Sequence, residues 1–345
     1  HGAVMEVITT CNDQFWFIRK LLKKGSDFLG CQFPIIGGAM TWVSEKNLVS
    51  AISNAGGLGV IACGAMEPSL LENEIISTQK LTKNPIGVNL ILMHPEIEKL
   101  IEICIENKIQ FIVFAGGIPK KKYINQFKAE GIKTIAFAST LFIANRLMNF
   151  GIDALIIEGS EAGGHIGPVS TNVLAQEILP FISEIPIFVA GGIGRGESFL
   201  NYLRQGAAGC QIGTRFVCAS ESVAHDNFKN IFIKSEARSA QVSIQLDDRL
   251  PVIPVRAIKN KASVLFLEKQ KEVLKNLEQG NVSLKEAQLT IEKFWSGSLK
   301  KAVIDGDIEN GSLMAGQSVS MVKKIQPVKE IIEEIIQQAS HEYSE

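Results

Sequence analysis

The segment ALIIEGSEAGGHIGP, residues 154–168, carries the pattern that decides the fold. A continuous apolar run, residues 154–157, leads into a glycine-rich loop that holds two acids and a histidine. Continuous rather than alternating hydrophobicity is typical of a strand that is buried on both faces. Seven more short apolar runs lie along the first two thirds of the chain, at residues 33–36, 58–62, 86–90, 111–115, 134–138, 187–190 and 209–212.

Stretches with helical spacing separate these runs. Ser44 is placed to cap a helix that Gly56 ends, and Pro68 is placed at the start of the next one. That second helix is expected to bury Leu70, Leu71, Ile75 and Ile76. A strand followed by a helix, eight times over, predicts an α/β fold, a (β/α)8 TIM barrel. An open doubly wound sheet is the alternative, and it rarely needs eight units.

The pattern changes after Thr214. Residues 262–295 are charged and have helical spacing, and a last helix is expected near residues 328–339. We therefore divide the chain into an N-terminal extension (1–27), a cofactor-binding TIM barrel core (28–220) and a mostly helical C-terminal segment (221–345) packed on the barrel. The extension contains FWFIRKLLKK, which predicts a helix with a solvated basic face rather than a membrane anchor.

Composition excludes several classes of function. The chain has 345 residues, 46% of them hydrophobic and 21% charged, and a net charge of -1. This balance offers no basic surface to a nucleic acid, and no apolar run suffices to cross a bilayer. The six cysteines form no CxxC pair, and a secretory signal is not recognisable, so we expect reduced thiols and a cytoplasmic location. No cluster of histidine, cysteine and acid predicts a metal site.

Glycine-rich loops follow most of the predicted strands, on the side where barrels bind ligands. The loops after the seventh and eighth strands form the usual phosphate site of such barrels, and Gly191, Gly192, Gly213 and Thr214 suit that task. The alternative explanation is that these glycines only allow tight turns and bind no ligand. A third glycine-rich loop, after the first strand, favours a cofactor that carries phosphate.

The expected cofactor is flavin mononucleotide (FMN). The loops contain few charges and several apolar residues, which suits a flat ring lying on the backbone, with Asn89 available to its polar edge. A dinucleotide would call for GxGxxG after an early strand and an acid about 20 residues later, and the chain has no such unit.

The chain resembles a known enzyme family over residues 28–335. The resemblance is carried by GGAMTWVSEKNLVSAISNAGGLGVIACG, PIGVN, EAGGHIGPVS, VAGGIGRGE, GAAGCQIGTRF and GSLMAGQ. They look like the nitronate monooxygenase (2-nitropropane dioxygenase) family and its close relatives, the FMN-dependent enoyl-acyl-carrier-protein reductases. These motifs are specific for the superfamily and not for the reaction.

The resemblance also implies site residues. The flavin contact of the family's GVN motif falls on Asn89, and the glycine of EAGGH falls on Gly163. The family's active-site histidine falls on His165. The phosphate-binding motifs fall on Gly191, Gly192, Gln211, Ile212, Gly213 and Thr214. The expected cofactor site is completed by Gly38, Ala39, Met40, Glu158 and Gly164.

Two positions depart from the family pattern. Glu158 stands where many nitronate monooxygenases have glutamine and where the reductases have glutamate. The first loop reads GGAM, residues 37–40, where both groups usually have QGGM. The run VRAIKN, residues 255–260, is also similar to the reductases.

We expect His165 to be catalytic, because an imidazole titrates near neutrality and this one lies beside the predicted flavin. His225 is expected to cap or orient a segment, His94 to lie in a loop, and Cys63 to pack as a small apolar side chain. Glu161 is expected to anchor the His165 loop.

Three functions are compatible with these motifs. The first is oxidation of alkyl nitronates or nitroalkanes by O2 to a carbonyl compound and nitrite. The second is NADH-dependent reduction of an enoyl thioester, for which basic runs at residues 120–122 and 300–301 would serve an acyl carrier protein. The third is a flavin-binding protein without turnover. A small-molecule substrate is expected in the first two, and a homodimer is plausible.

Overall fold

The computed structural model describes residues 12–250 and 254–344. Eight parallel strands run in the order β1-β9-β8-β6-β5-β4-β3-β2. They are β1 (Ile35–Gly37), β2 (Gly59–Ala62), β3 (Ile86–Ile91), β4 (Phe111–Ala115), β5 (Lys133–Phe137), β6 (Ala154–Glu158), β8 (Ile187–Ala190) and β9 (Gly209–Ile212). A parallel bridge between Ile36 and Leu58 joins the two ends of the sheet. The predicted TIM barrel is therefore confirmed, and each predicted apolar run contains a strand or overlaps one.

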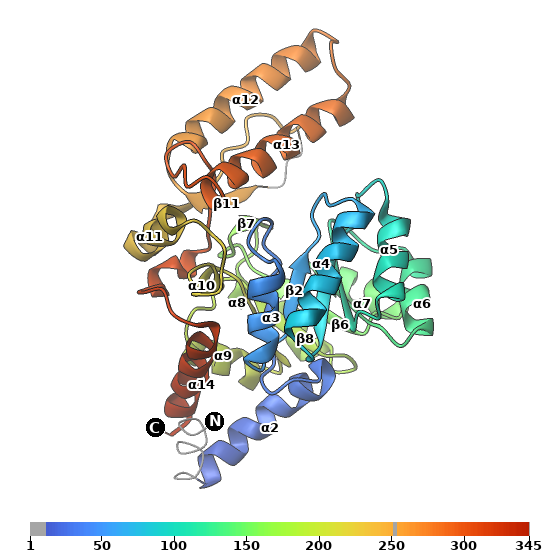
Figure 1. The fold of residues 1–345 in the computed structure, drawn as a ribbon, viewed down its shortest axis with the longest axis vertical. Helices are drawn as coiled ribbons and strands as arrows, with labels where there is room; N and C mark the ends of the chain where they lie inside the picture. Colours follow the sequence, from blue (N-terminus) through green and yellow to red (C-terminus); the bar gives the residue numbers. More distant parts are fainter. Residues whose placement is uncertain (1–11, 251–253, 345) are drawn as a thin grey trace.

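Helices cover the outside of the barrel (Figure 1). They are α3 (Lys46–Asn54), α4 (Pro68–Leu81), α5 (Ile97–Glu106), α6 (Lys121–Ala129), α7 (Leu141–Asn149), α8 (Thr171–Ile178) and α9 (Gly196–Arg204), with a single turn, α10 (Thr214–Val217), after β9. Two expectations were wrong in detail. Glu45, not Ser44, caps α3, because its carboxylate accepts from the backbone N–H groups of Asn47 and Leu48 at 3.0 and 3.2 Å. On α4, Leu71 and Ile75 are buried, but Leu70 and Ile76 are exposed.

The helix α2 (Asn12–Leu29) closes the end of the barrel where the strands begin. Its Phe28 contacts the rings of Phe111 and Phe188 at centroid distances of 5.7 and 6.1 Å. Leu29 is fully buried in the same inner cluster. The last turn of this helix is thus part of the barrel core, while Lys20 and Lys23 are exposed, as a solvated basic face requires.

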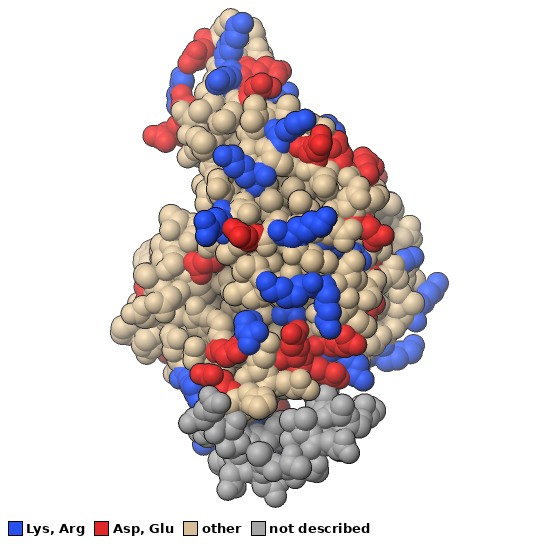
Figure 2. Space-filling view, turned by 90° about the vertical axis from the view of Figure 1, so that its left-hand side faces the viewer, with Lys and Arg blue, Asp and Glu red and all other residues tan. Residues whose placement is uncertain are grey.

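The C-terminal segment divides into two parts. The helix α14 (Val328–Ser344) packs on α9, α2 and α3. By contrast, α12 (Lys261–Glu278) and α13 (Leu284–Val303) form a hairpin that projects from the opposite end of the barrel (Figure 1). Both parts are helical, and the hairpin extends beyond the barrel at that end. Acidic and basic side chains are interspersed over the projecting part at the top of Figure 2.

A small antiparallel sheet connects the hairpin to the barrel, and the sequence did not indicate it. It contains β10 (Ala240–Val242), β11 (Val255–Ile258) and β12 (Leu313–Met314), and β11 also pairs with β7 (Gly164–His165). The remaining elements are α11 (Asp226–Lys234) and three 3-10 turns, η1 (Leu179–Phe181), η2 (Ala237–Ser239) and η3 (Gln317–Met321). Because β7 is the His165 loop itself, this sheet links that loop directly to the hairpin.

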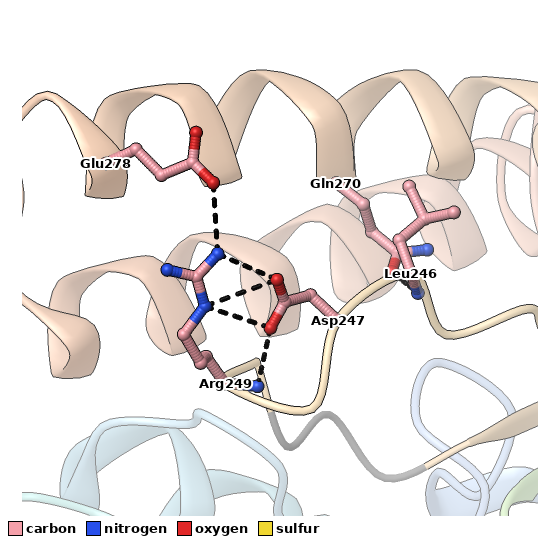
Figure 3. Close-up of polar contacts among 5 residues, drawn as sticks. All are labelled: Leu246, Asp247, Arg249, Gln270 and Glu278. Atoms are coloured by element: carbon pink, nitrogen blue, oxygen red, sulfur yellow. Dashed lines mark hydrogen bonds and ion pairs between the residues drawn. The ribbon is translucent and has the colours of Figure 1, made fainter.

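Residues 243–250 are fastened to α12 by polar contacts (Figure 3). The buried Gln270 accepts from the backbone N–H of Leu246 at 3.0 Å and donates to the carbonyl of Ile244 at 2.8 Å. Arg249 pairs with Asp247 and Glu278 at 2.8 and 3.0 Å. These contacts brace a separate apolar cluster in the hairpin, which contains Leu250, Val255, Phe266, Val273, Ala287, Ile291 and Trp295. In the described part of the chain, no helix is both long and apolar enough to pass through a lipid bilayer.

Candidate active site

A cavity of about 490 Å³ opens where the barrel strands end, at the side of the projecting hairpin. Every residue that the sequence predicted for the cofactor or for catalysis lines it. These residues are Gly38, Ala39, Met40, Asn89, Glu158, Gly163, Gly164, His165, Gly191, Gly192, Gln211, Ile212, Gly213 and Thr214. The size suits a cofactor or a drug-sized ligand.

One wall of the cavity was missed by the sequence analysis. It is formed by residues of α13, namely Glu292, Trp295, Ser296 and Leu299. The first barrel loop reaches this wall, because Trp42 Nε1 donates to the carbonyl of Ser296 at 3.2 Å and Lys300 lies 5.1 Å from the centre of the Trp42 ring. Nothing in the spacing of residues 284–303 indicates that this helix returns to the barrel mouth.

The loops after β8 and β9 present backbone donors to the cavity. Among the described residues, the N–H groups of Gly191, Gly192 and Gly213 have no backbone acceptor. A side chain at Gly213 would meet only Met40 Sδ, at 3.6 Å, so open space lies in front of this residue. Free N–H groups beside open space are the features that bind an anion.

Two arginines near these loops point elsewhere. Arg215 is buried, donates to the carbonyl of Gly194 at 2.7 Å and pairs with Glu334 of α14 at 2.6 Å. Arg195 pairs with Glu197 on the surface at 2.6 Å. The anion-binding potential of this corner therefore comes from the backbone and not from a guanidinium group.

The loop that carries His165 is held from both ends. The carboxylate of Glu161 accepts from the backbone N–H of Thr171 at 3.1 and 3.2 Å, so this residue anchors the loop as expected. The buried Arg256 donates from Nε to the carbonyl of Ser160 at 2.8 Å. Position 163 requires glycine, because a Cβ there would lie 2.6 Å from the backbone of Ala315. The glycine therefore permits close packing of the two chain segments at the edge of the cavity that it lines.

His165 faces an acid that the hairpin supplies. Its Nε2 lies 3.2 Å from Oε2 of Glu292, and the two side chains are 40% and 44% exposed. The backbone of His165 pairs with Val255 of β11, and this pairing fixes the position of the backbone that carries the imidazole. The imidazole is thus accessible to solvent and to a ligand, and it has an acceptor for one ring proton.

Glu158 ends β6 and lies on the cavity floor. Burial raises the pKa of its carboxyl group from 4.5 to about 7, and the nearby His165 only partly offsets that rise. A carboxyl group with such a pKa exchanges its proton near neutral pH, which is unusual outside functional sites.

Glu158→Gln is therefore expected to change how the stability of the cofactor-free protein depends on pH. Because folding raises this pKa from 4.5 to about 7, the wild type loses stability as the pH rises through that window. The variant has no such loss. At about pH 8 we therefore expect its free energy of unfolding to exceed that of the wild type by up to about 3 kcal/mol, and at about pH 5 we expect the two free energies to be close. Urea unfolding at both pH values measures this difference, and parallel stability curves would contradict it.

The remaining polar candidates have structural roles. His225 caps α11, because its Nδ1 accepts from the backbone N–H of Asn227 at 3.0 Å. His94 Nε2 lies 2.8 Å from the carbonyl of Met66 and so ties two loops together. Burial raises the pKa of the Cys63 thiol to about 12, which leaves it unreactive. In the ranges 12–250 and 254–344, no group of histidine, cysteine and acid is placed to hold a metal ion.

Known proteins resemble this chain over nearly its whole length. The family model described as "Nitronate monooxygenase" matches residues 23–100 and 95–338. A structure of FabK from Thermotoga maritima is 35% identical, covers 92% of this chain and 95% of its own, and has a TM-score of 0.81. A structure of nitroalkane oxidase from Streptomyces ansochromogenes, at 24% identity and a TM-score of 0.76, covers 92% of this chain and 98% of its own and shares the fold.

Two curated relatives differ in their named activities. A (3aS,4S,5R,7aS)-5-hydroxy-7a-methyl-1-oxo-octahydro-1H-indene-4-carboxyl-CoA dehydrogenase from Rhodococcus jostii is 28% identical over 91% of this chain and 94% of its own length. A probable nitronate monooxygenase from Staphylococcus aureus is 27% identical over 91% and 96%. Similar identity to both leaves the reaction to be argued from the site.

Proposed function

Because this chain belongs to the nitronate monooxygenase family, and is an oxidoreductase like its relatives, we propose that it uses FMN to oxidise alkyl nitronates or nitroalkanes with O2. The products would be a carbonyl compound and nitrite. The observation that carries this proposal is His165, an imidazole with a carboxylate partner at the wall of a cavity suited to a flavin. A flavin-binding protein without turnover would not need that pair.

The residues of the cavity fit FMN. The N–H groups of Gly191, Gly192 and Gly213 would hold the phosphate. Thr214 lines the same cavity, and its hydroxyl accepts from the backbone N–H of Gly316 at 3.0 Å. Asn89 would face the polar edge of the ring, while its Nδ2 already donates to the carbonyl of Val113 at 3.3 Å. Bound there, the flavin supplies a group that accepts and donates two electrons.

His165 would handle the proton of the substrate. A neutral nitroalkane must lose a proton from the carbon next to the nitro group before it becomes a nitronate, and a neutral imidazole can accept that proton. Glu292 lies within 3.2 Å of Nε2, so its carboxylate would stabilise the charged ring and keep its orientation. The α13 helix therefore contributes to the proposed chemistry as well as to the cavity wall.

Glu292→Gln is expected to lower turnover of a neutral nitroalkane by about 2- to 10-fold, because the pair is partly exposed and screened by water. FMN content should not change, since Glu292 is on the wall formed by the hairpin. Glu268→Gln is the matched control, because Glu268 is an exposed glutamate on α12 with no contact to the cavity. Steady-state rates of the three proteins measure the effect, and a Glu292 variant as fast as the control would argue against this role.

Reduction of an enoyl thioester is the second candidate. Two observations favour it, namely Glu158 at the position where the resemblance places a reductase-type residue, and a Rhodococcus relative whose name specifies a CoA thioester. In that reaction, His165 would help supply a proton to the α-carbon while NADH supplies the electrons. The basic runs are partly engaged already, since Lys122 pairs with Glu98 at 2.9 Å and Lys300 lies over Trp42. Docking of an acyl carrier protein, a homodimer and a cytoplasmic location stay predictions.

An anaerobic reduction experiment separates the two reactions. The purified holoenzyme is mixed without O2 with NADH, with NADPH or with an alkyl nitronate, and the oxidised flavin band is followed. Nitronate oxidation predicts bleaching by the nitronate and none by either nicotinamide. Rapid bleaching by NADH would replace nitronate oxidation with the reductive reaction, and a protein without a flavin spectrum would overturn both.

A further inference from the structure

Glu158 has an unusual position for an acidic side chain. As the last residue of β6, it pairs with Ala190 of β8. On the other side, Phe137 of β5 pairs with Ile156 and lines the same cavity. Within the described residues, no hydrogen bond to its carboxyl group is found. A carboxylate in such surroundings lacks the donors that normally stabilise a negative charge.

Few charges face Glu158 from the elements around it. The cavity is lined by three titratable side chains, Glu158 on the floor, His165 on the wall and Glu292 at the hairpin, and by no lysine or arginine among the described residues. Glu161, the other acid of this loop, is turned to the backbone of Thr171. Among these side chains, only His165 could offset a charge on Glu158, and its Nε2 already has Glu292 as a partner.

We propose that Glu158 is a redox-linked proton acceptor, which would take up a proton from solvent when FMN bound in the cavity is reduced and would release it on reoxidation. This inference rests on the proposed function, because it requires FMN in the cavity. A ring that receives two electrons and one proton gains one negative charge. In the same step, the carboxylate of Glu158 gains a proton and becomes a neutral carboxylic acid. Reduction then consumes two electrons and two protons, and reoxidation returns both.

The electrostatics give this uptake its direction. Burial raises the pKa of Glu158 to about 7, so near neutral pH the group is divided between its two forms. A new negative charge nearby disfavours the carboxylate and raises the pKa further. Between the pKa of Glu158 beside oxidised flavin and its higher pKa beside reduced flavin, reduction must therefore bring a proton to Glu158. At a pH below both pKa values, Glu158 is protonated in both redox states and takes up no extra proton on reduction.

The experiment measures the reduction potential of bound FMN against pH. Mediated spectroelectrochemistry of the holoenzyme from about pH 6 to about pH 9 gives the number of protons taken up per electron pair from the slope. Around pH 8, we expect the wild type to take up about one proton more than Glu158→Gln, and Glu268→Gln to match the wild type. Glutamine keeps the size and polarity of the side chain but cannot titrate.

The outcomes distinguish this inference from the proposed function. Equal slopes for the wild type and Glu158→Gln, with FMN bound to both, would overturn the redox-linked role and leave the proposed function intact. Loss of FMN from Glu158→Gln alone would also overturn it, because Glu158 would then be a group that binds the cofactor. A wild type that binds no FMN would overturn the proposed function itself. The inference is supported if the wild type and Glu268→Gln take up the extra proton on reduction and Glu158→Gln does not.

Discussion

Replacing His165 by alanine is expected to leave FMN bound and to lower turnover of a neutral nitroalkane by about 10²- to 10⁴-fold, the usual contribution of a general base. The cofactor should stay because the proposed phosphate donors belong to the loops after β8 and β9, and the floor belongs to the strands. His165 lies on β7, at the wall of the cavity, with its side chain 40% exposed. Truncating it therefore removes the base without leaving a buried hole.

The matched measurement uses the same two proteins with a preformed nitronate. That anion has already lost its proton, so the variant should retain most of the wild-type rate on it and lose the rate on the neutral substrate. A flavin spectrum and a thermal unfolding curve check that the variant is folded and loaded. Loss of FMN would mean that His165 is structural, and equal losses on both substrates would argue against its role as a base.

The barrel could be predicted from the sequence because its signals are local. Each strand is buried on both faces and reads as a continuous apolar run, and each glycine-rich loop follows its strand directly. The cavity residues on these loops follow from the barrel geometry, which brings all strand ends to one side. Details on the scale of a single turn, such as which residue caps a helix, were harder to predict. At the start of α3, Ser44 is the preferred type of capping residue and Glu45 is not. The structure nevertheless gives the cap to Glu45, because the Ser44 hydroxyl accepts from the N–H of Met40 and donates to the carbonyl of Gly38.

The hairpin wall could not be predicted, because it depends on contacts between segments far apart in the chain. Glu292 reaches His165 across 127 residues, and the pairing of β7 with β11 joins strands of two and four residues. Such short strands leave almost no periodic signal. The charged spacing of residues 262–295 predicts helical structure, but it does not reveal which barrel loop these helices will meet.

Replacing Gly213 by leucine is expected to weaken FMN binding by about 10- to 100-fold or more, in line with the cost of overpacking a site by one side chain. Gly213 suits this test because its backbone angles, φ -120° and ψ -66°, tolerate a side chain. The side chain would also enter open space rather than the protein, with Met40 Sδ as its nearest neighbour at 3.6 Å. Gly192 suits it less, since its φ of 75° would strain any other residue whether or not a phosphate lies there.

Gly167→Leu is the matched control, because a side chain at Gly167 also meets open space and this residue is not part of the cavity lining. Titration of each cofactor-free protein with FMN, followed by flavin fluorescence, gives the two dissociation constants. The control should bind like the wild type, and both variants should unfold at the wild-type temperature. Undiminished binding by the folded Gly213 variant would remove the phosphate from this corner. The backbone N–H groups of Gly191 and Gly192, on the neighbouring loop, would then be the donors left to hold the phosphate.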